Sequence, residues 1–293
     1  MQTLETLSEH KIFNGIQSFH THQSQATNTP MRFSVFTPKK INAVLYFLAG
    51  LTATEETFAI KAGAQKVAAE LGLMLICPDT SPRNTGTPDE AKDWDFGTAA
   101  SFYLNATQAP WQKHFQMETY VTQELREVIA NNWPVEALWE TTKSSSDPSR
   151  VNTGIFGHSM GGHGALTLAL RHPELYKSVS AFAPIAAPTQ CAWGHKAFAG
   201  YLGDDKAEWA NHDASELMSQ LQAPYPKGIL IDQGLADKFL AEQQLLPEHF
   251  EAACAKAQQP LTLRRHADYD HGFYFVATFM EDHLRFHHRC LVG

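Results

Sequence analysis

The chain has 293 residues, of which 43% are hydrophobic and 18% are charged, and its formal net charge is −8 at pH 7. This length can bury a sizeable core, and an acidic balance without a Lys/Arg-rich run excludes nucleic acid as a partner. The N-terminus lacks a basic region followed by an apolar one, and no apolar run is long enough to cross a bilayer. We therefore expect a cytoplasmic protein with no membrane partner.

Short apolar runs recur along the chain and are typical of strands buried on both faces of a parallel sheet. They lie at Ala43–Leu48, Leu73–Cys77, Val151–Phe156, Val179–Ala183, Gly228–Ile231 and Leu261–Leu263. Helical patterns separate them, at Thr57–Leu71, from Met117 to about Asn131, from Ser159 to before Pro173, at Ala241–Lys256 and at Phe275–His287. This alternation predicts a doubly wound α/β architecture, and we expect residues 1–293 to form a single domain. The polar stretch Thr141–Ser149 is expected to be a surface insertion.

The possible metal ligands are scattered along the sequence. The cysteines are Cys77, Cys191, Cys254 and Cys290. They form no C-x-x-C pair, which argues against zinc and against a disulfide framework, and free thiols suit a reducing compartment. His158 and His163 are five residues apart with no third ligand in sight, so packing is their expected role. The sequence predicts neither a metal nor another cofactor.

The segment Gly157-His158-Ser159-Met160-Gly161-Gly162 follows a predicted strand and precedes a predicted helix. This is the layout of a nucleophile elbow, in which a serine lies at the tip of a sharp strand-to-helix turn. Side chains at the glycine positions would crowd such a turn, and a helix N-terminus favours developing negative charge. A bystander serine in a glycine-rich loop would lack this context, so we predict Ser159 as a nucleophile.

A serine nucleophile needs a histidine to take its proton and an acid to orient that histidine, in the chain order serine, acid, histidine. Two acids follow the next candidate strand. Asp232 lies within or at the end of that strand, whereas Asp237 lies beyond Gly234 in the following loop. We predict Asp237 as the acid and expect Asp232 to cap or pair locally.

Several histidines follow the predicted acid. They are His249, His266, His271, His283, His287 and His288. Four lie in or at the end of predicted helices, where a solvated helix face or a last-turn cation is the simpler interpretation. His266 ends a strand and is a weaker rival. His271 lies in a turn-forming loop just before an aromatic helix start, so we predict it as the base.

An oxyanion hole in this arrangement takes one amide from the residue after the nucleophile and one from a loop after an early strand. Met160 follows Ser159, and the loop Ala49-Gly50-Leu51-Thr52 follows the first predicted strand. We predict the amides of Leu51 and Met160 as the two donors, with Gly50 allowing a close backbone approach. A plain strand-end turn would account for Gly50 alone.

Six blocks of the sequence resemble the S-formylglutathione hydrolases, also called esterase D. They are Leu48–Thr52, Pro78–Arg83, Phe102–Trp111, Gly157–Leu166, Asp232–Phe239 and Tyr269–Phe275. The resemblance runs from about Thr3 to the C-terminal helix, and generic esterase motifs lack the Tyr-Leu-Asn-Ala-Thr-Gln-Ala-Pro-Trp block. It implies an α/β-hydrolase fold, with a mostly parallel central sheet flanked by helices on both faces. It also implies the same catalytic residues: Ser159, Asp237, His271 and the amides of Leu51 and Met160.

The resemblance further implies hydrolysis of the thioester S-formylglutathione to glutathione and formate, the last step of glutathione-dependent formaldehyde detoxification. Such enzymes are cytoplasmic and often dimeric. A general short-chain carboxylesterase and an acyl transferase are the competing enzyme hypotheses. A catalytically inactive binding module is a third alternative, and the complete predicted set of catalytic residues argues against it.

Two positions depart from the family pattern. The family commonly has cysteine where this chain has Ala53, so we predict comparative resistance to thiol reagents. It often has serine after the catalytic histidine, where Gly272 stands here.

The remaining expectations concern the substrate. A formyl group needs only a small acyl pocket, and the aromatic candidates for narrowing it are Trp94, Phe102, Trp111 and Trp193. Each is as readily explained as a core residue. Glutathione is anionic and requires a local cation such as Lys61 or Arg83, between which the sequence does not choose.

Overall fold

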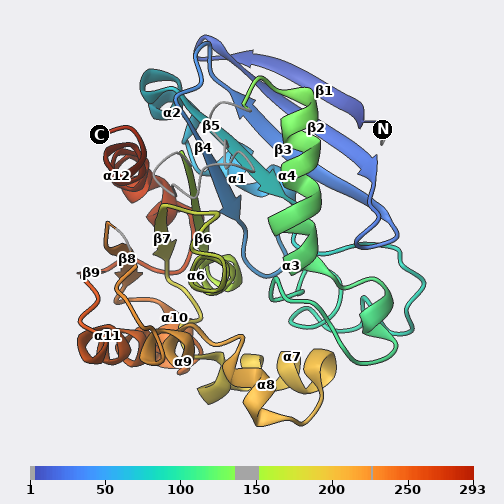
Figure 1. Cartoon of the computed structure of the whole chain (residues 1–293), viewed down its shortest axis with the longest axis vertical. Helices are drawn as coiled ribbons and strands as arrows, with labels where there is room; N and C mark the ends of the chain where they lie inside the picture. The colour runs from blue at the N-terminus through green and yellow to red at the C-terminus, as the bar shows by residue number, and fades with distance from the viewer. Residues whose placement is uncertain (1–3, 136–151, 226) are drawn as a thin grey trace.

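The computed structural model describes residues 4–135, 152–225 and 227–293. They contain a nine-stranded sheet with the spatial order β1-β2-β3-β5-β4-β6-β7-β8-β9 (Figure 1). The strands are β1 (Leu4–Ile12), β2 (Gly15–Gln23), β3 (Pro30–Thr37), β4 (Ala43–Leu48), β5 (Leu73–Pro78), β6 (Thr153–His158), β7 (Ser178–Phe182), β8 (Ile229–Gly234) and β9 (Leu261–His266). The expected insertion at Thr141–Ser149 lies outside the described residues and stays a prediction.

The part of the sheet from β5 to β9 is parallel, and all six predicted strands are found there. Strands β4 to β8 are buried along their whole length. Their continuous apolar sequences are what burial on both faces requires. The prediction of a mostly parallel sheet in an α/β fold is confirmed.

Three N-terminal strands have no counterpart in the sequence prediction. They pair antiparallel with one another, and β3 pairs antiparallel with β5. Strand β2 buries polar side chains that form hydrogen bonds: His20 Nε2 lies 2.7 Å from Ser18 Oγ, and His22 Nε2 lies 3.1 Å from the hydroxyl of Tyr120. Because the buried side of this strand is polar, a search for apolar runs does not detect it.

Helices cover both faces of the sheet (Figure 1). They are α1 (Glu55–Lys61), α2 (Gln65–Leu71), α3 (Met117–Thr119), α4 (Leu125–Asn132), α6 (Met160–Arg171), α7 (Ala192–Leu202), α8 (Lys206–Ala210), α9 (Ala214–Ser219), α10 (Lys238–Ala241), α11 (Pro247–Lys256) and α12 (Phe273–Leu291). The π-helical segment η2 (Tyr120–Glu124) joins α3 to α4, and η1 (Trp111–Lys113) and η4 (Pro188–Gln190) are short 3₁₀ helices. On one face α12 packs against β6, β7 and β8 and contacts α1 and α2, and on the other α6 packs against β4, β6 and β7. Within the described ranges, no helix is both long enough and apolar enough to cross a membrane.

Several helices differ from the sequence prediction. The segment Thr57–Leu71 forms two helices, because Gly63 between them has a φ of 66°, in the left-handed region that glycine favours. The segment Ala241–Lys256 is also divided, and Pro247 at the first helical position begins α11. Helices α7, α8 and α9 were not predicted, and α8 and α9, with five and six residues, are too short for a helical period to be recognised.

Candidate active site

Ser159 forms the turn between β6 and α6. Its backbone has a φ of 59° and a ψ of −121°, which residues other than glycine rarely adopt. Three backbone hydrogen bonds hold it there: its amide donates to Phe182 (2.9 Å), and its carbonyl accepts from His163 (3.0 Å) and Ile185 (3.3 Å). This is the geometry of a nucleophile elbow.

Close backbone packing explains the glycines around the serine. A Cβ atom on Gly161 would lie 1.9 Å from the carbonyl oxygen of Leu48, and one on Gly157 would lie 2.2 Å from the carbonyl oxygen of Gly161. A Cβ atom on Gly50 would lie 3.0 Å from the Cβ atom of Ser159. The loop after β4 therefore lies directly against the serine.

Asp237 and His271 are brought together from the loops that follow β8 and β9. His271 Nδ1 lies 2.5 Å from Asp237 Oδ2. The same carboxylate accepts a hydrogen bond from Gln233 Nε2 (3.2 Å) and, as the N-cap of α10, one from the amide of Phe239 (2.8 Å). The Asp237 side chain is fully buried, so these bonds fix the carboxylate and hold the His271 ring with Nδ1 toward the acid and Nε2 away from it.

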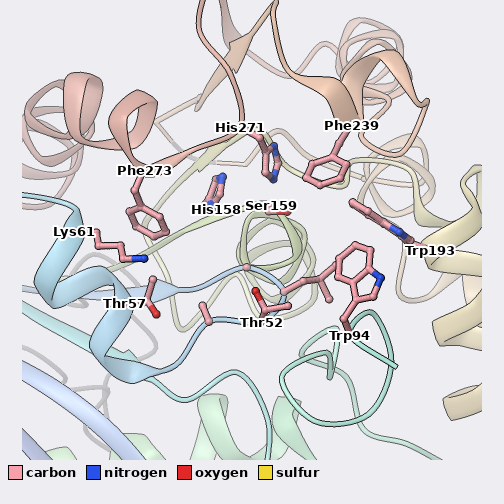
Figure 2. A pocket seen from close by; sticks show the side chains of 13 residues that line it. Thr52, Thr57, Lys61, Trp94, His158, Ser159, Trp193, Phe239, His271 and Phe273 are labelled. Atoms are coloured by element: carbon pink, nitrogen blue, oxygen red, sulfur yellow. The ribbon is translucent and has the colours of Figure 1, made fainter. Parts of the chain in front are cut away.

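Ser159 and His271 line one cavity of about 350 Å³ (Figure 2). The lining residues are Gly50, Leu51, Thr52, Ala53, Thr57, Lys61, Trp94, His158, Ser159, Trp193, Phe239, His271 and Phe273. No hydrogen bond joins the Ser159 hydroxyl to His271 in the part of the chain that the structure describes. Such bonds often tighten only when the reacting group is bound.

The amides of Leu51 and Met160 belong to two segments next to the serine, the loop after β4 and the start of α6. Leu51 lines the cavity, and Met160 is the first residue of α6. Among the described residues, neither amide donates a hydrogen bond to a protein acceptor. Two unpaired amides beside a serine, one of them at a helix N-terminus, can bind a negatively charged oxygen.

The alternative acid and base belong to another cluster. Arg264 Nε and Nη2 each donate to the Asp232 carboxylate at 2.6 Å, and His266 Nε2 lies 3.2 Å from it. Burial raises the pKa of Asp232, but the hydrogen bonds from His283 and Arg264 outweigh it and hold the pKa well below its usual range. None of these residues lines the cavity. The expectation that Asp232 caps or pairs locally is wrong, because its partners Arg264 and His283 come from β9 and α12, distant in the sequence.

The prediction of a solvated helix face for His283 and His287 is wrong, because both side chains are fully buried. His283 Nδ1 lies 2.8 Å from Ser180 Oγ, and His287 Nε2 lies 2.9 Å from the same oxygen. Burial lowers the pKa of both histidines. Their hydroxyl partners come from β7, which the sequence of α12 alone does not reveal.

His158 packs as expected, but it also lines the cavity. Its ring centroid lies 4.6 Å from that of His271. Burial, with a smaller contribution from neighbouring His271, lowers the pKa of His158 well below its usual value, so its ring is neutral at pH 7. Within the described ranges, no three His, Cys, Asp or Glu side chains are grouped as a metal site requires.

Only part of the predicted aromatic and cationic lining is found at the cavity. Trp94, Trp193 and Lys61 line it, whereas Phe102, Trp111 and Arg83 do not. The two tryptophan rings meet edge to face, with centroids 5.5 Å apart. Sequence reasoning missed Phe239 and Phe273, although each lies two residues after a predicted catalytic residue and could have been found by that spacing.

Known proteins match nearly the whole chain. The family model described as putative esterase matches residues 24–286. The S-formylglutathione hydrolase of Paracoccus denitrificans (strain Pd 1222) is 49% identical over 287 residues, which cover 97% of this chain and 96% of that protein. The S-formylglutathione hydrolase of Rattus norvegicus is 46% identical over 98% of this chain and 99% of its own length. A solved structure of an S-formylglutathione hydrolase from Agrobacterium tumefaciens has a TM-score of 0.88 and 43% identity, with coverage of 98% of this chain and 99% of that one. This chain belongs to the S-formylglutathione hydrolase family of esterases.

Proposed function

We propose that this protein hydrolyses S-formylglutathione to glutathione and formate, with Ser159 as the nucleophile, His271 as the base and Asp237 as the acid. The observation that carries the proposal is the Asp237–His271 hydrogen bond, which orients the histidine at the same cavity as the strained serine. Relatives named S-formylglutathione hydrolase, with 46% and 49% identity, support the choice of substrate.

In the acylation step, Ser159 Oγ attacks the formyl carbon while His271 takes the hydroxyl proton. The amides of Leu51 and Met160 stabilise the oxyanion, and each such donor contributes about 3 kcal/mol. The carbon–sulfur bond then breaks, His271 returns the proton to sulfur, and glutathione leaves as a thiol. Asp237 keeps the His271 tautomer and stabilises the imidazolium.

Deacylation repeats this chemistry with water. His271 takes a proton from water, whose oxygen attacks the formyl carbon of the ester on Ser159. The bond between that carbon and Ser159 Oγ breaks, the proton returns to the serine, and formic acid leaves and ionises to formate.

The catalytic roles are tested by replacing the proposed nucleophile. We expect Ser159→Ala to lower kcat for S-formylglutathione by at least about 10⁴-fold, since members of a triad act as a unit. Asp237→Asn should also lose activity, because it no longer holds the required histidine tautomer. Full activity of folded Ser159→Ala would overturn the mechanism.

The substrate is tested by comparing kcat/KM for S-formylglutathione, S-acetylglutathione and p-nitrophenyl acetate. We expect the formyl thioester to have the highest value. A much higher value for the acetyl compounds would instead indicate a general short-chain carboxylesterase.

The resemblance also leads us to propose a cytoplasmic location and a homodimer. The four cysteines are free thiols, which is consistent with a reducing compartment. Cell fractionation tests the location. Sedimentation equilibrium tests the assembly, and a mass of 32.6 kDa at micromolar concentration would overturn the dimer.

A further inference from the structure

The cavity contains a cation although the protein as a whole is acidic. The formal net charge is −8, yet no Asp or Glu is among the described residues that line the cavity, and Lys61 is the one lysine or arginine there. Lys61 lies in the last turn of α1. Its ammonium group points into the cavity, between Thr57 and Phe273 (Figure 2).

Other cations near the cavity already have partners. Arg83 donates from Nε (2.6 Å) and Nη2 (2.8 Å) to the carboxylate of Asp79, and Nη2 also donates to the carbonyl of Ala53 (3.1 Å). Lys196 Nζ lies 2.5 Å from Asp95 Oδ1 and is thereby neutralised. Lys238 Nζ lies 4.6 Å from the centroid of the Phe239 ring and does not line the cavity.

Lys61, by contrast, forms no ion pair with any described residue. A lysine on a helix is often paired with an acid four residues before it, but that position is Thr57, whose hydroxyl accepts from the amide of Thr54. The acids of α1, Glu55 and Glu56, lie in its first turn. A positive charge in the last turn interacts favourably with the helix dipole, but this interaction does not require the Lys61 side chain to point into the cavity.

We propose that Lys61 binds a carboxylate of the glutathione part of the substrate and thereby determines specificity for anionic leaving groups. This inference rests on the proposed function. Glutathione carries two carboxylates, and the aromatic wall formed by Phe273, Phe239 and the tryptophans lowers the local dielectric and strengthens the attraction. Because the contact involves the leaving group and not the reacting carbon, it acts on substrate binding and hence on KM.

The test compares Lys61→Ala and Lys61→Arg with the wild type and with Lys66→Ala as a matched control. Lys66 is exposed on α2 and does not line the cavity, so its replacement removes the same charge elsewhere. We expect Lys61→Ala to raise KM for S-formylglutathione about three- to ten-fold at low salt, with kcat unchanged. Lys61→Arg should retain most of the binding, and p-nitrophenyl acetate, which is neutral, should be hydrolysed equally by all four proteins.

A second measurement does not depend on thioester turnover. Reduced glutathione is used as a competitive inhibitor of p-nitrophenyl acetate hydrolysis, and its inhibition constant should rise by a similar factor in Lys61→Ala. Added sodium chloride should weaken this inhibition in the wild type far more than in Lys61→Ala.

The outcomes separate this inference from the proposed function. An unchanged KM and an unchanged inhibition constant in Lys61→Ala would overturn the binding role of Lys61. Its only role would then be the favourable interaction with the dipole of α1. An equal effect of Lys61→Ala on p-nitrophenyl acetate would also overturn it, because a general loss of structure would explain both. Failure of the wild type to hydrolyse S-formylglutathione would instead overturn the proposed substrate, and the glutathione inhibition would still test Lys61.

Discussion

Ser159 holds its backbone at a φ of 59° and a ψ of −121°, where residues other than glycine lose about 1–3 kcal/mol. The surrounding structure maintains this conformation through hydrogen bonds from β7 and α6. The strained backbone of Ser159 therefore lowers the stability of the folded protein at the residue whose hydroxyl must reach the substrate in the proposed mechanism.

This strain predicts an order of stability between two inactive variants. We expect Ser159→Gly to be more stable than Ser159→Ala by about 1 kcal/mol, because glycine relieves the strain and alanine does not, with part of the gain offset by the entropy of glycine in the unfolded chain. Urea unfolding followed by circular dichroism measures the difference. Equal stability of the two variants would show that the backbone at Ser159 is not strained.

A second residue-scale prediction concerns Ala53, which lines the cavity. The native cysteines do not line it, and burial raises the pKa of Cys191 to about 11 and that of Cys254 to about 12, which suppresses the reactive thiolate. We therefore expect N-ethylmaleimide to leave the wild type active and to inactivate Ala53→Cys. Residual activity after timed incubation measures this effect.

The control for that experiment is Cys290→Ser, since Cys290 is the cysteine that is not fully buried. It should respond as the wild type does. Rapid inactivation of the wild type that disappears in Cys290→Ser would contradict the expected resistance.

The order of residues along the chain was enough to predict some roles from the sequence. Roles that depend on which side chains meet in the folded protein could not be predicted. Asp237 and His271 follow Ser159 in the order that a triad requires, and the structure brings the pair together. The choice between Lys61 and Arg83 stayed open, because only the folded chain shows that Arg83 is bound to Asp79.

At the scale of elements, the turn from β6 to α6 leaves no room for a side chain at Gly161. We expect Gly161→Ala to lower the free energy of unfolding by about 2–3 kcal/mol, since its Cβ atom would lie 1.9 Å from the backbone oxygen of Leu48. Gly272→Ser is the contrasting variant: this N-cap of α12 has an extended backbone and no side-chain cap, so serine should add a few tenths of a kcal/mol.

Urea unfolding of both glycine variants checks these signs. A stable Gly161→Ala would mean that the elbow can move away from β4. A destabilised Gly272→Ser would mean that the contact with Asp270, whose Oδ1 lies 3.2 Å from the added Cβ atom, outweighs the cap.

The elements that could be predicted are those with a local signature. The run Ala43–Leu48 matches β4 at both ends, because a strand buried on both faces is apolar throughout. Strand β2 was missed, since it is held by polar partners distant in sequence, such as Tyr120 for His22. Local periodicity cannot reveal such partners.

At the scale of the whole molecule, many histidines are buried in the neutral form. Burial lowers the pKa of His20, His22, His158, His163, His212, His283 and His287. The pKa of His20 falls to about 4 and that of His163 to about 3. In the unfolded chain these residues titrate near their usual value of about 6.5, so the unfolded state binds more protons as the pH falls.

The free energy of unfolding should therefore decrease as the pH falls below about 6.5. One histidine such as His163 is expected to lower the free energy of unfolding by about 2 kcal/mol between pH 6.5 and pH 5. The low pKa of Asp232 in the folded protein affects the free energy of unfolding only at lower pH. Its contribution to stability is lost below about pH 4, where the carboxyl takes up a proton in the unfolded chain. Urea unfolding at pH 7.5, 6.5 and 5 measures the slope, which should be smaller in His163→Asn, and a flat profile would contradict the prediction.

The net charge predicted that nucleic acid is not a partner, but it could not predict the electrostatic field inside the cavity. The chain is acidic as a whole, while the described residues place a lysine and no carboxylate around the serine. The sign of a local field depends on which side chains the fold brings together, and net charge averages over all of them.

The sheet itself positions the proposed site through two pairs of neighbouring strands, β4 with β6 and β8 with β9. Strands β4 and β6 are neighbours, with Leu48 paired to Gly157, so the loop with Leu51 and the turn with Ser159 share one hydrogen-bonded frame. Asp237 and His271 follow β8 and β9, at the far end of the sheet. In the proposed mechanism, polarisation of the substrate carbonyl is thus preorganised and needs no rearrangement in each turnover. In the proposed mechanism the loops after β8 and β9 set the distance for proton transfer, so we expect substitutions in those loops to change the rate of that step without altering the binding of the oxyanion.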